Sequence, residues 1–162
     1  MFQQLFGKRR TETKAAAEQL LRSAVAKLPR AEHLGRAGVW VVPGAVQATY
    51  RPLAVLWPEA GGVDCVVTAN IVFDRDFLPR ELLLQILEAN RAELPGRFWL
   101  MPWKGQRMVT LADFIPTGTV TGPELARRID QLLKRYGDVV QRLYALDLLL
   151  EGPEPFCHGH GA

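Results

Sequence analysis

A turn at Lys104-Gly105 is the feature that most constrains the fold, because it joins two runs of strand-forming residues. The run before it reads RFWLMPW (97–103), and the run after it reads RMVTLADFI (107–115). Both runs are rich in the aromatic and β-branched side chains that favour strands. Two such runs with a tight turn between them predict a β-hairpin, and therefore antiparallel sheet.

The length of the loop decides which side chains share a face of this hairpin. If the loop has two residues, directly opposed residues have numbers that sum to 209 and lie on the same face. A four-residue loop would shift the partners but keep the faces, whereas a three-residue loop would exchange them. With two residues, one face pairs Leu100 with Val109 and Phe98 with Leu111. The other pairs Met101 with Met108, Trp99 with Thr110 and Trp103 with Gln106.

The second of these faces is unusual because it combines Trp and Met with polar neighbours. Such side chains are favoured where a protein surface is covered by another molecule, since they supply a large and adaptable contact area. Pro102 cannot donate to a sheet ladder and so places this strand near an edge or an end. Our hypothesis is that Trp99, Met101, Trp103 and Met108 form a partner-binding face. The alternative is that a helix of the same chain covers them.

Helical and strand-like segments precede the hairpin. Apolar residues recur at three- and four-residue spacing between Thr13 and Leu28, which predicts a helix that ends at Pro29. Three strand-like runs follow, at 37–44, 46–57 and 61–73. Alternation in the last run assigns one set of side chains to the core: Val63, Cys65, Val67, Ala69, Ile71 and Phe73. Cys65 is then a small buried hydrophobe rather than a nucleophile.

Two further helices have recognisable starts. The first begins at or near Asp76, with Pro79 in its first turn. The second begins with Thr121 and Glu124 at the spacing of a capping box. The helix that begins near Asp76 is expected to bury the stripe Leu82, Leu83, Ile86 and Leu87. After the second, Gly137 and Asp138 suggest a stop and a new cap, so residues 138–150 form either a further helix or a bent continuation.

The resulting order of elements, α-βββ-α-ββ-α(α), predicts an α+β fold in which helices pack on an antiparallel five-stranded sheet. We expect a single domain at 13–150. The ends, a basic segment at 1–12 and a tail at 151–162, are expected to be flexible.

Composition and charge limit the functional classes. The chain has 162 residues, 48% hydrophobic and 23% charged, which is the balance of a folded globular protein. No apolar run is long enough to cross a bilayer, so we expect a cytoplasmic protein. Residues 1–36 hold eight Lys or Arg and three Glu, whereas the whole chain has a net charge of +3. The basic first helix therefore supports an alternative function, as a peripheral membrane or nucleic-acid adaptor.

Sequence motifs for catalysis and for phosphate binding are absent, and we expect neither an enzyme nor a cofactor or small-molecule substrate. His33 is the one histidine before the tail, and a lone histidine is more often structural or solvated. Cys157, His158 and His160 could ligate Zn²⁺, but three donors within four residues have no second segment to complete a tetrahedral site. We therefore expect no metal.

The chain also resembles a known group of proteins. Asn90 near the end of a helix, the triplet Gly96-Arg97-Phe98 opening a strand, a short hairpin, and a helix opened by Thr121 and Glu124 are similar to the type III secretion chaperone-like fold, including the YbjN-like bacterial proteins. The resemblance covers roughly residues 13–136, while the residues after Gly137 and the net basic charge depart from it. It implies a non-enzymatic module that forms a homodimer or binds a segment of another protein.

Overall fold

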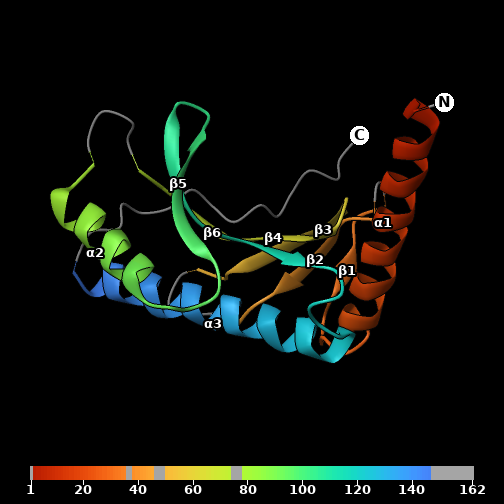
Figure 1. Ribbon diagram of the computed structural model, residues 1–162. Coiled ribbons are helices and arrows are strands. Elements are labelled where there is room, and N and C mark those ends of the chain that lie inside the picture. The colour runs from red at the N-terminus through yellow and green to blue at the C-terminus, as the bar shows by residue number, and fades with distance from the viewer. Residues whose placement is uncertain (1, 36–37, 46–49, 74–77, 147–162) are drawn as a thin grey trace, which may run out of the picture.

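The computed structural model describes residues 2–35, 38–45, 50–73 and 78–146 and shows an α+β fold (Figure 1). Six strands form one antiparallel sheet in the order β1-β2-β3-β4-β6-β5. The helices are α1 (Phe2–Val25), α2 (Arg80–Arg91) and α3 (Gly122–Ala145). The strands are β1 (Glu32–His33), β2 (Trp40–Pro43), β3 (Leu53–Glu59), β4 (Gly62–Phe73), β5 (Arg97–Trp103) and β6 (Gln106–Pro116).

The helices pack against one face of the sheet, which we call the helix face. α3 contacts β3, β4 and β6, α1 contacts β3, β4 and α3, and α2 contacts β5 and α3. Figure 1 shows α3 running beneath the sheet, with α2 near one end and α1 near the other. The side chains of the helix face are almost completely buried: Ala54, Leu56, Val63, Cys65, Val67, Phe98, Val109, Leu111 and Ile115.

The sheet has six strands rather than the expected five, because Glu32 and His33 pair with Val41 and Trp40. A two-residue strand shows no alternation, so the pattern of the sequence could not reveal it. The neighbouring strands are also shorter than expected, since β2 begins at Trp40 and β3 at Leu53.

The helix at the C-terminal side runs through Gly137, so the expected stop and new cap there are wrong, and of the two alternatives the structure shows a continuation as far as Ala145. α3 extends from Gly122 to Ala145, and its buried side chains keep their helical spacing on both sides of Gly137. A glycine inside a helix costs about 1 kcal/mol, which packing against the sheet outweighs. The capping box at Thr121 and Glu124 is confirmed, because the Thr121 N–H donates to the Glu124 carboxylate over 2.7 Å.

The other two helices also differ in detail from expectation. α1 begins at Phe2, eleven residues before the expected start. α2 buries Leu82, Ile86 and Ala89, whereas Leu83 and Leu87 are exposed, so the expected stripe is only half right. The expected cap Asp76 lies outside the described residues. None of the helices in the described part of the chain is long and apolar enough to span a membrane.

The alternation expected in β4 is confirmed at Val63, Cys65 and Val67, which are fully buried. Burial raises the pKa of the Cys65 thiol far above its ordinary value, so the sulfur remains protonated. The register of β4 against β6 shifts between Thr68 and Val72. At this bulge the Ala69 N–H donates to the hydroxyl of Tyr136, which in turn donates to the Val109 carbonyl. α3 therefore holds the irregular part of the sheet in place.

Candidate sheet-face interaction site

The hairpin has the two-residue loop that the sequence predicts. Lys104 and Gly105 both have positive φ, 46° and 82°, as a turn that matches the twist of a β-hairpin requires. The partners are those whose numbers sum to 209, from Phe98 opposite Leu111 to Trp103 opposite Gln106. Both faces of the hairpin are therefore confirmed, with Phe98, Val109 and Leu111 buried on the helix face.

Trp99, Met101, Trp103 and Met108 share the opposite face of the sheet, which we call the open face. No helix of the described chain packs on this side. The Trp99 side chain is 60% exposed and that of Met101 is 38% exposed. Trp103 is half-buried, with the Lys104 ammonium 5.7 Å from its ring centre. Met108 is only 4% exposed and lies between Met101 of β5 and Val72 of β4. Three of the four candidates thus present accessible surface.

The open face continues across the sheet beyond the hairpin. The pairing of the strands aligns Val41, Val55, Val66 and Ala112 in one row, and all four side chains are half-buried. A second row aligns Trp57 with Asp64 and Phe114, and the Phe114 ring is 46% exposed. The alternation of side chains along 53–59 and 107–115 predicts that Val55, Trp57, Ala112 and Phe114 share one face of their strands. The β5–β6 hairpin alone does not predict that Val55 and Trp57 of β3 share the face that carries Trp99, because this depends on the pairing of β3, β4 and β6.

A hollow lies beside Trp99 at the start of β5, where β6 extends past it. It has a volume of about 460 Å³, and it is lined by the segment 94–97, Trp99, the segment 112–114 and Arg128. The carboxylate of Asp113 is held by Arg128, 2.7 Å from carboxylate oxygen to guanidinium nitrogen. The hollow therefore combines two exposed aromatic rings with an ion pair and the side chain of Arg97.

The edge of the sheet next to this site is protected against pairing with another strand. The Asn90 side chain of α2 donates to the Phe98 carbonyl over 3.0 Å and accepts the Phe98 N–H over 2.8 Å. The backbone N–H and C=O groups alternate in direction along a strand, so those of Leu100 and Pro102 also point to this edge. Pro102 has no N–H to donate to an added strand. At the other edge, β1 is only two residues long. A partner protein is therefore expected to bind the face of this sheet rather than to pair with an edge strand.

Replacing Asn90 with Ala is expected to lower the free energy of unfolding by about 1–3 kcal/mol, because both backbone groups of Phe98 lose their partner. Urea denaturation of the purified protein measures this change. Glu88→Ala on the exposed side of α2 is the matched control and should change stability by less than about 0.5 kcal/mol. Equal stability of the Asn90 variant and the wild type would show that water replaces these bonds without cost.

The α2–β5 loop that positions Trp99 is fixed by a buried cation. The guanidinium of Arg135 donates to the carbonyls of Ala89 (2.6 Å), Gly96 (2.9 Å) and Leu94 (3.3 Å), and also to that of Pro95. It also lies 5.3 Å from the centre of the Phe98 ring. Burial, and then the nearby charge of Arg97, lowers the pKa of Arg135. The start of β5 is therefore a rigid part of the molecule.

Other residues considered from the sequence contribute no additional chemistry to this face. His33 is exposed on β1, with its ring 4.9 Å from the ring centre of Trp40 in an edge-on arrangement. The tail residues Cys157, His158 and His160 lie outside the described residues. Within the described ranges, no group of three His, Cys, Asp or Glu side chains is placed to hold a metal ion.

Comparison with known proteins gives no assignment. A scan against protein-family models finds no match, and a search of curated proteins finds no similar sequence. The resemblance to the type III secretion chaperone-like fold therefore stays a prediction based on Asn90, the Gly96-Arg97-Phe98 triplet and the capping box.

Proposed function

We propose that this protein is a cytoplasmic, non-enzymatic protein-binding module, chaperone-like or regulatory, that holds a segment of a partner protein on the open face. The observation that carries the proposal is the exposure of Trp99, Met101 and Phe114 on the open face, the side of the sheet on which no helix of the described residues packs. Exposed aromatic and Met side chains grouped in this way mark interaction surfaces more often than isolated apolar residues do.

The geometry favours an apolar segment with one bulky anchoring side chain. Trp99 and Phe114 border the hollow together with the charged Arg97, Asp113 and Arg128, so the proposed anchor is a bulky side chain that also carries a polar group. The row from Val41 to Ala112 then offers a flat apolar surface on which the rest of the segment can lie. A second copy of the chain, giving a homodimer, is the other occupant to be tested.

The test compares Trp99→Ser/Phe114→Ser with Leu84→Ser/Leu87→Ser, which removes exposed apolar side chains from α2 instead. The four side chains are 46–62% exposed, so both variants should keep the fold, as thermal unfolding will verify. Sedimentation velocity reports self-association, and quantitative capture from the native cytoplasm followed by binding to the recovered partner reports affinity. We expect the open-face variant to weaken binding about tenfold or more, about 1.4 kcal/mol, with no change for the α2 variant.

Two results would contradict the proposal. Unchanged association of the open-face variant would show that this face is not used, and loss of binding in the α2 variant alone would move the interface to the leucines of that helix. Loss of self-association without a captured partner would support the homodimer.

The alternative function, as a membrane or nucleic-acid adaptor, is favoured by one observation. The segment that holds Lys8, Arg9 and Arg10 belongs to α1, and Figure 1 shows the N-terminal part of this helix extending beyond the sheet. Reversal of these three charges serves as a third arm of the same experiment. It should abolish binding to anionic vesicles or nucleic acid under the alternative and leave the open-face interaction unchanged.

A further inference from the structure

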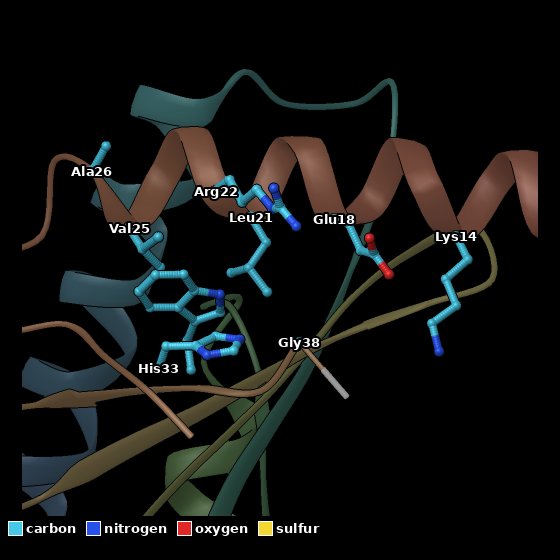
Figure 2. Close-up of a pocket in the computed structure, with 9 residues that line it drawn as sticks. Lys14, Glu18, Leu21, Arg22, Val25, Ala26, His33 and Gly38 are labelled. Carbon is cyan, nitrogen blue, oxygen red and sulfur yellow. The ribbon is translucent and has the colours of Figure 1, made fainter. Parts of the chain in front are cut away.

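A second candidate site lies on the other side of the sheet, between α1 and the β1–β2 edge. We call it the α1 groove. Its floor is formed by Leu21, Val25 and Trp40, and its rim by Lys14, Glu18 and Arg22. Figure 2 shows Lys14, Glu18 and Leu21 directed from α1 toward the sheet, with His33 on the facing strand. The volume of about 710 Å³ falls within the roughly 300–1,000 Å³ of small-molecule sites.

The floor of the groove is suited to an apolar ligand body. Leu21 and Val25 are buried by the core beneath them, and Trp40 is half-buried. The ring of His33 packs edge-on against Trp40 at 4.9 Å and supports it from the side. Because Leu21 and Val25 are only 1% and 6% exposed, a hydrocarbon chain in the groove removes apolar area from water mainly at Trp40, and Leu21 and Val25 form the packed layer behind it.

The rim of the groove is cationic. Lys14, Glu18 and Arg22 occur at four-residue spacing, so they line one side of α1 over about 12 Å. Neither Lys14 nor Arg22 forms an ion pair with a carboxylate of the described residues, among which the ion pair is that of Arg128 with Asp113. The three rim charges sum to +1. A guanidinium that is not engaged by a carboxylate is a good partner for an incoming one, because its fork matches the two oxygens.

We propose that the α1 groove binds an amphipathic carboxylate, namely a medium-chain alkanoic acid. The alkyl chain lies on Leu21, Val25 and Trp40, and the carboxylate meets Arg22, with Lys14 adding to the positive potential. The ligand is held and not transformed, since the proposal requires no reaction. This function goes beyond the proposed partner binding, because the groove is on the helix side of the sheet and shares no residue with the open face.

The experiment uses three probes of equal chain length: octanoate, 1-octanol and octylammonium. Isothermal titration measures affinity, and ¹H–¹⁵N correlation spectra locate the site through the indole N–H of Trp40. We expect octanoate to bind about fivefold or more tightly than 1-octanol, and octylammonium to bind most weakly. Equal affinity for octanoate and 1-octanol, or shifts confined to the indoles of Trp99 and Trp103, would overturn the proposal.

Charge variants of α1, and of Lys27 just after it, provide the matched comparison. Arg22→Glu should weaken octanoate binding about tenfold, whereas Lys27→Glu, the same change of charge outside the groove, should weaken it less than twofold. Glu18→Gln removes the rim carboxylate and should strengthen binding about twofold to fivefold. The Trp99→Ser/Phe114→Ser variant should bind octanoate as the wild type does. A negative result for octanoate binding at the α1 groove can therefore be told apart from a negative result for partner binding at the open face. Equal effects of the Arg22 and Lys27 variants would also overturn the proposal.

Discussion

Replacing Arg135 with Met is expected to lower the free energy of unfolding by about 3–5 kcal/mol, the largest effect of any single change considered. The guanidinium satisfies the carbonyls of Ala89, Leu94, Pro95 and Gly96, and Met leaves these groups without a donor. The side chain of Arg135 is only 9% exposed, so water cannot simply replace it. Chemical denaturation measures the loss, which corresponds to a fall in melting temperature of roughly 10 °C or more.

Two companion variants make this result specific. Arg142→Met, on the exposed side of the same helix, should change stability by less than about 0.5 kcal/mol. Arg135→Lys should be intermediate, because an ammonium cannot reach several carbonyls at once with the geometry of a guanidinium. If Arg135→Met and Arg142→Met had equal stabilities, the contacts of Arg135 would not fix the α2–β5 loop.

Replacing Gly96 with Ala is expected to cost about 2–5 kcal/mol. Gly96 has φ of +79°, where an L-residue is strained by about 1–2 kcal/mol. An added Cβ would also lie 2.9 Å from side-chain carbons of Leu111 and Leu132, which are fully packed, and overpacking adds about 1–3 kcal/mol. Urea denaturation of the variant gives the sum of the two effects.

Gly118→Ala separates strain from packing in this prediction. Gly118 has φ of +84°, and an added Cβ would meet nothing within 4 Å. Gly118→Ala should therefore lower the free energy of unfolding only by the backbone strain energy, about 1–2 kcal/mol. The difference between the two alanine variants is the packing cost at Gly96, and a difference of zero would contradict the tight contact between this loop, β6 and α3.

The faces of the β5–β6 hairpin could be predicted because two local rules agree. The pair Lys104-Gly105 sets the loop at two residues, and the alternation of side chains then assigns Trp99 and Met101 to one face and Phe98 to the other. The capping box at Thr121 is similarly local. The sequence does not assign the neighbouring Phe114 to the site, because Phe114 lies beyond the last pair of the β5–β6 hairpin, where the course of the segment 94–97 depends on tertiary contacts such as those of Arg135.

The inward side of α2 could not be predicted, because apolar residues surround most of the helix. Leu82, Leu83, Leu84, Ile86 and Leu87 allow more than one buried stripe. Contact with α3 and β5 selects the side that contains Leu82, Ile86 and Ala89. The floor of the α1 groove depends in the same way on tertiary structure, since Leu21 and Trp40 belong to different layers.

The position of α3 has a consequence for synthesis of the protein. This helix covers β3, β4 and β6 and contacts both other helices, yet it is the last element of the described chain. On the ribosome, α1, α2 and the six described strands are made before residues 122–145, so the part of the helix face that α3 covers stays exposed until they follow. We expect the nascent chain to expose apolar surface at this stage, and such surface is prone to aggregate.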